Sequence, residues 1–402
     1  MDHRRQENRE QPQAVDVPIV KMHGLGNDFV MVSEPLRDSK SYRSPPSGGH
    51  TVADVEVPPL SPLLAALAAT SHTFPSYVPA ASRARSVWAG GVGHVTKTLC
   101  TRRFGVGADG LTLLLPPFAT LSTLPGKPAH HFRFELYNPD GSAAPMCGNA
   151  LRCAAKLVWE RRGQLLPDWL WAAKNEDGKN DRNVLYIETP AGTMVAHLTV
   201  TDGGAHVTAI RVDMGKPDFA RSAVPCTLPS AATASLQSKD TGDLPVLEED
   251  YVFEGVTYQF SSLVVGVPHT VVFVDDADKV PLYTLGPALE KDRSIFPQGT
   301  NVGFVQVLPA NKINYWAWER GVGETLACGT GASAAAVVAT VLDRVDPTKP
   351  VHAHLTGGDL TLRVDFSPTA AKEGRDRYQS VERVWMEGPA DVVFDGVARV
   401  TL

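Results

Sequence analysis

The chain has 402 residues, of which 43% are hydrophobic, and this length and composition suffice for two compact domains with separate cores. Its 38 lysine and arginine residues against 44 aspartate and glutamate residues give a formal net charge of -6 without a basic stripe, which argues against a nucleic-acid partner. No apolar run approaches the roughly 20 residues that cross a bilayer, so we expect no membrane partner either.

The N-terminus and two internal stretches have the composition of segments outside a folded core. Residues 1–16 alternate charge signs and lack the apolar region of a secretory signal, so we expect a disordered tail. A stretch at about residues 37–93 is rich in Ser, Pro, Ala and Gly, and residues 168–183 are polar; we expect both to be surface insertions. The five cysteines are few and scattered, which predicts a reducing, cytoplasmic location rather than a disulfide scaffold.

Between these stretches the chain carries short runs of β-branched, aromatic and other apolar residues that are typical of strands. Ala-rich segments with helical spacing also occur. The mixture predicts an α+β fold. The strand-like runs are Phe29–Val32, Leu111–Leu115, Phe132–Tyr137, Leu185–Glu188, Leu263–Val265 and Val271–Val274.

Two segments repeat one another. PMCGNALRCAAKLV, from residue 145, and LACGTGASAAAVVA, from residue 326, both place Cys-Gly in front of an Ala-rich helical pattern. At equal spacing before the cysteines, Asn138 and Glu319 each close an aromatic-rich strand. We infer a duplication in which each half supplies one cysteine, Cys147 or Cys328, to a site between the halves.

The repeated segments have residues suited to inverting a carbon centre. Gly148 and Thr330 stand at predicted helix starts, where unpaired N–H groups and the helix dipole favour a carboxylate. The same placement is expected to lower the pKa of Cys147 and Cys328. A thiolate on one face of a Cα and a thiol on the other can remove and return a proton with inversion. Taken singly, each cysteine fits a buried apolar residue better than a catalytic one, and the paired context reverses this in favour of catalysis.

Other sequence patterns give weaker indications of function. Cys153 lies on the apolar face of the first helix, and we expect it to pack in the core. GVGADG, from residue 105, matches G-x-G-x-x-G but precedes a strand, the reverse of a dinucleotide site. His130 and His131 are adjacent without further ligands at suitable spacing, so no metal is predicted. No G-x-S-x-G motif of a serine hydrolase is present.

Six motifs together resemble the diaminopimelate epimerase family, and the resemblance runs from about Val17 to the C-terminus. The two Cys-Gly motifs and the ERGVGET segment are its most specific parts. The motifs are KMHGLGNDFV (from residue 21), RFGVGADG (103), YNPDGS (137), MCGNALRC (146), ERGVGETLACGTGA (319) and VWMEGPADVVFDG (384).

The resemblance implies a cofactor-independent isomerase that converts LL-diaminopimelate to meso-diaminopimelate in lysine biosynthesis. It also implies two pseudo-symmetric domains, each a curled mixed sheet around a central helix, and a homodimer. We expect the N-terminal domain at residues 17–190, joined by residues 387–402, and the C-terminal domain at residues 191–386. The implied catalytic residues are Cys147, Cys328, Glu319 and His269. The implied substrate-binding residues are Asn27, Asn138, Gly148, Asn149, Asn301, Arg320, Gly329 and Thr330.

Two departures from the family pattern leave other functions than diaminopimelate epimerisation open. Family members often have Asn where Val267 stands, which would bind the far end of the substrate, and Gly where Ala150 stands. One alternative is a related two-cysteine racemase of proline, hydroxyproline or histidine type, although such relatives tend to have His at the position of Asn149. The other is a catalytically silent binding protein with the same fold.

Overall fold

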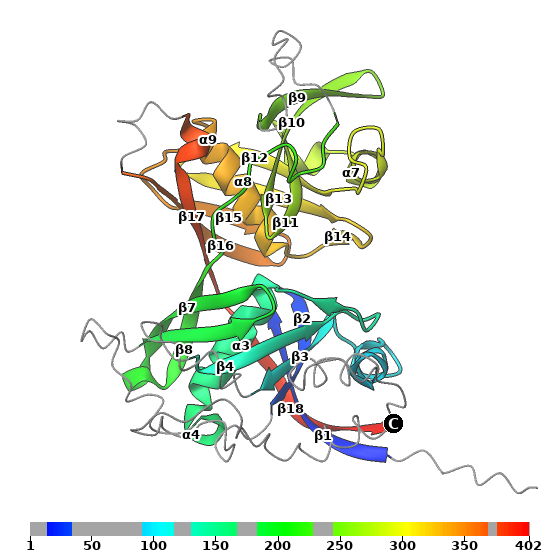
Figure 1. The fold of residues 1–402 in the computed structure, drawn as a ribbon, viewed down its shortest axis with the longest axis vertical. Helices are drawn as coiled ribbons and strands as arrows, with labels where there is room; N and C mark the ends of the chain where they lie inside the picture. Colours follow the sequence, from blue (N-terminus) through cyan, green and yellow to red (C-terminus); the bar gives the residue numbers. More distant parts are fainter. Residues whose placement is uncertain are drawn as a thin grey trace, which may run out of the picture.

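The computed structural model describes residues 14–33, 91–115, 130–166, 183–227, 244–368 and 376–401. Figure 1 shows two lobes, one above the other, each with a sheet that curls around one helix. These helices are α3 (Gly148–Glu160) and α8 (Gly329–Val341), the two Ala-rich segments that follow the cysteines. The predicted α+β fold with two pseudo-symmetric halves is confirmed.

The first lobe is a mixed sheet around α3. Its strands are β1 (Ala14–Gly24), β2 (Asn27–Ser33), β3 (Gly110–Leu115), β4 (Phe132–Tyr137), β5 (Ala143–Ala144), β6 (Val184–Thr189), β7 (Gly192–Thr201) and β8 (His206–Asp213). Parallel pairs, β2 with β3 and β4 with β6, are separated by antiparallel ones. Its short helices are α4 (Arg162–Leu165) and η3 (Asp202–Gly204).

The second lobe is built in the same way around α8. Its strands are β9 (Val246–Phe253), β10 (Val256–Val265), β11 (Val267–Phe273), β12 (Asn301–Leu308), β13 (Lys312–Glu319), β14 (Gly323–Thr325), β15 (Val351–Leu355), β16 (Gly358–Phe366) and β17 (Val381–Gly388). Its helices besides α8 are η5 (Ala277–Lys279), α7 (Leu282–Lys291) and α9 (Arg377–Ser380).

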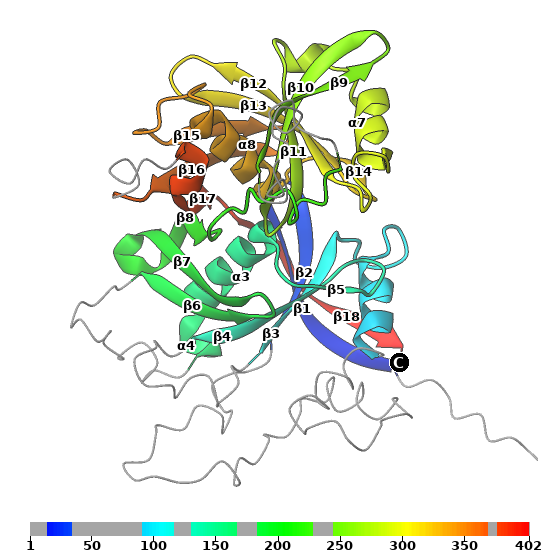
Figure 2. The ribbon, with the colours of Figure 1, turned by 45° about the horizontal axis from the view of Figure 1, so that its top comes forward.

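The order of strand pairing repeats in the two lobes and confirms the duplication. In the second lobe, β11 pairs with β12 and β13 with β15 in parallel, and the neighbouring pairs are antiparallel. The short β5 and β14 pair with equivalent strands, β4 and β13. A helix at residues 91–100 precedes β3 as α7 precedes β12, and Figure 2 shows both on the outside of their lobes.

Two strands near the C-terminus join the lobes. Strand β17 pairs with β16 on one side and with β8 of the first lobe on the other, so that one sheet runs through both lobes. The chain then enters β18 (Asp391–Thr401), which pairs with β1 along almost its whole length. Strand β18 therefore has the place beside β1 that β9 has beside β10.

Three predicted boundaries are wrong. Strand β1 begins at Ala14, inside the expected tail, and residues 91–93 of the expected insertion are helical, with Val92 in a hydrophobic core. The border at 190/191 cuts the antiparallel pair of β6 and β7, since a sequence turn does not reveal which sheet the next strand joins. Residues 1–13, 34–90 and 167–182, which hold most of the tail and both insertions, lie outside the described residues.

The two central helices are buried on nearly every side, α8 by small or apolar residues and α3 by a mixture that includes Arg152 and Lys156. Ala and Val occupy most positions of α8, and a helix that is apolar all round belongs inside a sheet layer rather than on its surface. Cys153 of α3 is buried in the main core cluster, as predicted. Within the described residues, no helix is long and apolar enough to span a membrane.

Candidate active site

The two cysteines occupy equivalent positions at the starts of the central helices. Cys147 is the residue before α3 and Cys328 the residue before α8, and both have extended backbone conformations. Neither side chain forms a capping hydrogen bond, but backbone N–H groups of the first helical turn act on both sulfurs. The first N–H groups of a helix lack intrahelical acceptors, which makes both positions suited to an anion.

Contacts across the lobes bring the two helix starts together. Asn149 Nδ2, in the first turn of α3, donates to the carbonyl of Ala327 at 3.0 Å, immediately before Cys328. The same amide nitrogen donates to Asn27 Oδ1 at 3.2 Å. Asn149 is buried, and a β-carbon added to Gly329 would lie 3.5 Å from its Oδ1. The two predicted binding segments therefore form one site.

Met386 of β17 explains why glycine follows each cysteine. A β-carbon on Gly148 would lie 2.5 Å from Met386 Cε, and one on Gly329 would lie 2.7 Å from Met386 Sδ. The thioether thus fills the space between the first turns of α3 and α8. Both distances are below what atoms in contact adopt, so the fully buried methionine requires both glycines. Sequence reasoning missed this residue because it stands far from both cysteines in the chain.

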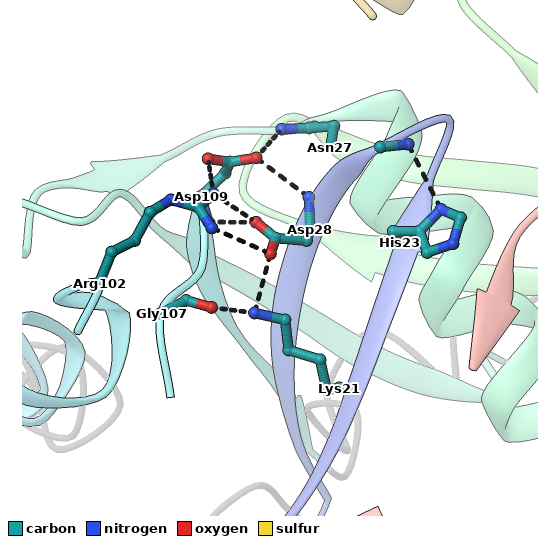
Figure 3. A network of polar contacts seen from close by, with 8 residues as sticks. Lys21, His23, Asn27, Asp28, Arg102, Gly107 and Asp109 are labelled. Atoms are coloured by element: carbon teal, nitrogen blue, oxygen red, sulfur yellow. Dashed lines mark hydrogen bonds and ion pairs between the residues drawn. The ribbon is translucent and has the colours of Figure 1, made fainter. Parts of the chain in front are cut away.

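The Cys147 sulfur faces a polar network on β1 and β2. Its Sγ lies 3.8 Å from Asn27 Oδ1, to which the thiol can donate. Asn27 Nδ2 in turn donates to Asp109 Oδ2 at 2.9 Å, which fixes the orientation of the amide, as Figure 3 shows. Asp109 also accepts from the Asp28 backbone N–H at 3.0 Å. The side-chain carbonyl of Asn27 is therefore held toward Cys147.

Charged side chains complete this network. Arg102 Nη2 lies 2.8 Å from both Asp109 Oδ1 and Asp28 Oδ1, and Lys21 Nζ lies 2.8 Å from Asp28 Oδ2 and donates to the Gly107 carbonyl (Figure 3). The GVGADG motif, which precedes β3 as expected, therefore supports Asn27 through Asp109. The sequence signal that could have revealed this network is the presence of charged residues in both motifs, Lys21 and Asp28 in KMHGLGND and Asp109 in GVGADG.

Cys328 lies among different partners. Its Sγ is 3.6 Å from the Thr330 hydroxyl and interacts with the Glu319 carboxylate at the end of β13. Thr325 donates to Glu319 Oε1 at 2.6 Å. Tyr315, which sequence reasoning missed, is buried on the same strand and interacts electrostatically with Cys328. The structure thus places Glu319 and Thr330 beside Cys328.

Burial outweighs the helix starts in setting the thiol pKa values. It is the largest effect on both cysteines and raises the pKa of each above its ordinary value. The N–H groups of Asn149 and Ala150 lower the pKa of Cys147, and Thr330 and Gly331 lower that of Cys328, but by less. The expectation of a net lowering is therefore wrong. Burial also raises the pKa of Glu319.

The remaining predicted residues lie around these two centres. Asn301 donates to the Pro268 carbonyl at 2.8 Å and accepts from the Arg320 backbone at 2.9 Å, while the exposed Arg320 side chain donates to the Gln298 carbonyl. Asn138 is exposed and donates to Ser142 within its own turn. For Asn138 the described residues provide no contact with either cysteine.

His269 is fully buried near the start of β11. Among the described residues neither ring nitrogen has a hydrogen-bond partner. Burial, with the nearby charge of Arg320, lowers the pKa of His269 to about 3. The imidazole is therefore neutral at physiological pH.

Comparison with known proteins agrees with this architecture. The family model for diaminopimelate epimerase matches residues 86–220 and 261–375. A diaminopimelate epimerase from Pelotomaculum thermopropionicum is 40% identical over 298 residues, covering 74% of this chain and 86% of the relative. One from Moorella thermoacetica is 33% identical over 377 residues, covering 94% and 97%.

Solved structures share the fold at low identity. A hydroxyproline epimerase from Agrobacterium vitis has a TM-score of 0.52 and 14% identity, and a probable proline racemase from Agrobacterium radiobacter has 0.54 and 13%. Each comparison covers 96% of this chain and 93% of the other. The duplicated fold and the sequence relatives define an isomerase of the epimerase class. The chain belongs to the diaminopimelate epimerase family.

Proposed function

We propose that this protein converts LL-diaminopimelate to meso-diaminopimelate by moving protons between Cα and the pair Cys147 and Cys328, as a step of lysine biosynthesis. The observation that carries the proposal is the meeting of two helix starts, each preceded by a cysteine, across pseudo-symmetric lobes. The names of relatives at 33–40% identity support the substrate.

The proposed reaction needs no group transfer. A thiolate takes the Cα proton from one face, and the thiol opposite returns its own proton to the other face, so configuration inverts and the protonation states of the two sulfurs are exchanged. The reacting carboxylate lies against the N–H groups at Gly148, Asn149, Gly329 and Thr330, where helix ends favour an anion. Glu319 and the neutral His269 would adjust the pKa values of the two thiols.

The far end of diaminopimelate distinguishes this substrate from simpler amino acids. We assign its carboxylate to Arg320, because a guanidinium binds carboxylate oxygens bidentately, with the amides of Asn138 and Asn301 as further donors. Val267 opens β11 and offers no hydrogen bond where relatives often have Asn. Asn27 would line the pocket beside Cys147, whose thiol it contacts.

A turnover assay in deuterated water tests the proposal. Inversion of LL-diaminopimelate with deuterium at one Cα is expected, with far slower turnover of lysine, proline and hydroxyproline. Cys147→Ser and Cys328→Ser should each abolish inversion, whereas Cys100→Ala, in a separate core cluster, should retain it. A preference for proline or hydroxyproline would favour the racemase alternative. No exchange with any amino acid would identify a silent binding protein.

We also propose a cytoplasmic homodimer. None of the five cysteines, all of which lie in the described residues, forms a disulfide, which suits a reducing compartment. On β18 the side chains of Val393, Phe394 and Val397 are 53%, 43% and 68% exposed, apolar surface that a second copy would cover. Light scattering should give the mass of a dimer for the wild type and of a monomer for Phe394→Asp; a monomeric wild type would contradict the proposal.

A further inference from the structure

We propose that Arg152 is a positioning residue for the reaction, and that its buried guanidinium is the positive charge that makes the thiol of Cys147 lose its proton before that of Cys328. In the resting enzyme Cys147 is then the proton acceptor and Cys328 the donor. The reaction itself rests on the function proposed above. The charge pairing does not, because it concerns the state of a thiol before any substrate binds.

Arg152 is a buried cation without an anionic partner. Its side chain is 0% exposed and the largest of the fully buried side chains. Nε donates to the Pro389 carbonyl at 3.1 Å, and Nη1 lies 3.7 Å from Met386 Sδ. Within the described residues, Nη2 meets no acceptor and no carboxylate pairs with the guanidinium. An uncompensated buried charge is strongly destabilising, so a role must account for its presence.

The fold makes room for this guanidinium beside the active site. A β-carbon on Gly24, at the end of β1, would lie 3.0 Å from Nη2 and 3.3 Å from the β-carbon of Asn149. One on Gly388, at the end of β17, would lie 3.4 Å from Nε. The guanidinium therefore lies where strands of both lobes end, next to the first turn of α3. From there it interacts electrostatically with Cys147 and favours the thiolate.

The duplicated half has no such cation. The residue five positions after Cys147 is Arg152 (152 − 147 = 5), and the residue five after Cys328 is Ser333 (333 − 328 = 5), which donates to the Gly329 carbonyl at 2.8 Å. Glu319 lies instead beside Cys328, where its negative charge raises the thiol pKa. One cysteine therefore has a cation on its own helix and the other has a carboxylate beside it.

The other ionisable groups that act on this pair do not reverse the assignment. Glu319 also raises the pKa of Cys147, but there its effect ranks below those of the Ala150 and Asn149 N–H groups, whereas on Cys328 it ranks directly after burial. Cys153 adjoins Arg152, and burial raises the pKa of Cys153 to about 12, so it stays a thiol at neutral pH. Asp391 acts on Cys153 and is exposed. Of the two cysteines, Cys147 is thus the one whose ionisation Arg152 favours.

The pairing makes the two reaction directions unequal. A turnover that starts with the Cys147 thiolate ends with a Cys147 thiol and a Cys328 thiolate, because one proton is taken and one is given. That product state separates the negative charge from Arg152 and places it near Glu319. Return of a proton from water to Cys328, and loss of one from Cys147, restores the resting state.

The first test uses the wild-type enzyme without substrate. The rate of iodoacetamide alkylation of each cysteine, located by tandem mass spectrometry, is measured from pH 6 to pH 11. The proposal predicts that Cys147 reacts with a midpoint at least about one pH unit below that of Cys328. A Cys328 midpoint at or below that of Cys147 overturns it.

Variants separate charge from packing. Arg152→Met removes the charge and should raise the Cys147 midpoint by about one unit or more, whereas Arg152→Lys should restore at least half of that shift. The control is Arg221→Met, which removes a buried arginine that pairs with Glu249 at 2.9 Å in the second lobe, and should leave the Cys147 midpoint unchanged. A folded Arg152→Met protein with the wild-type midpoint would show that Arg152 only holds the Pro389 carbonyl.

The alkylation assay and the epimerase assay can fail separately. If diaminopimelate is not turned over but the Cys147 midpoint depends on Arg152, the proposed function is wrong and the charge pairing stands. If diaminopimelate is turned over at the wild-type rate by Arg152→Met and the midpoints do not move, the function stands and the pairing is wrong.

Discussion

Asn149, in the first turn of α3, donates a hydrogen bond of 3.0 Å to the carbonyl of Ala327, in the other lobe. The bond joins the segment after one cysteine to the segment before the other. Because the same nitrogen also contacts Asn27 Oδ1, a single amide fixes the distance between the two halves of the site. The identity of this side chain therefore matters more than its size.

Asn149→Asp tests this role without changing the shape of the side chain. A carboxylate oxygen would face two acceptor oxygens in a buried place, so we expect kcat/KM to fall by about 100-fold, near 3 kcal/mol. The control is Asn314→Asp, because Asn314 donates to Gln306 Oε1 and the glutamine amide can rotate to donate instead. Steady-state kinetics and thermal unfolding are the measurements. Wild-type kinetics for Asn149→Asp would contradict the role.

Asp109 should act on activity through Asn27. Asp109→Leu removes the acceptor that orients the Asn27 amide, and we expect kcat/KM to fall on the order of ten-fold, since the carbonyl facing Cys147 is then free to turn away. Asp109→Asn keeps an acceptor oxygen and should retain most activity. Equal losses in both variants would show that the ion pair with Arg102, rather than the amide, is what matters.

Gly329→Ala should destabilise the protein through Met386. The added β-carbon would lie 2.7 Å from Met386 Sδ in a buried place, so we expect the free energy of unfolding to fall by about 1–3 kcal/mol. Combined with Met386→Ala, which vacates that space, the two effects should be less than additive. Gly163→Ala is the control, since its β-carbon would meet nothing within 4 Å. Strict additivity in denaturant unfolding would exclude the contact.

The buried His269 should make the protein less stable in acid. Its pKa of about 3 in the folded protein lies below the ordinary value of 6.5, so the unfolded chain binds more protons between these pH values. Stability from this residue is therefore complete above about pH 6.5 and is lost as pH falls toward 3. His269→Gln should lose on the order of 1–3 kcal/mol less than the wild type between pH 7 and pH 4.

Denaturant unfolding at several pH values measures the effect of His269. The exposed His352→Gln is the matched control and should follow the wild type. Parallel pH curves for the wild type and His269→Gln would show that folding does not lower the pKa of this imidazole.

Arg320→Lys tests the assignment of the far carboxylate. Lysine keeps the charge but loses the planar fork, so we expect kcat/KM for diaminopimelate to fall ten-fold or more, about 1.4 kcal/mol per decade. Arg363→Lys, on β16, replaces another exposed arginine and should have wild-type kinetics. An unchanged kcat/KM in Arg320→Lys would show that Arg320 does not bind the far carboxylate.

Sequence patterns predicted the parts of this molecule that depend on local spacing. The two Cys-Gly helix starts, the strands that end at or just before Asn138 and Glu319, and the core position of Cys153 all follow from period and composition. Met386, Tyr315 and Asp109 were missed because their contacts join segments far apart in the chain. The net rise of the thiol pKa values was missed for the same reason, since burial is a property of the assembled lobes.

The pairing of β1 with β18 sets an order in which the protein can be completed on the ribosome. Arg399 forms an ion pair with Asp16 across this pair, 383 residues earlier in the chain. Until β18 emerges, β1 keeps an unpaired edge, and exposed strand edges promote association with other chains. The first lobe, although made first, therefore closes last, and the second lobe can fold while the first waits.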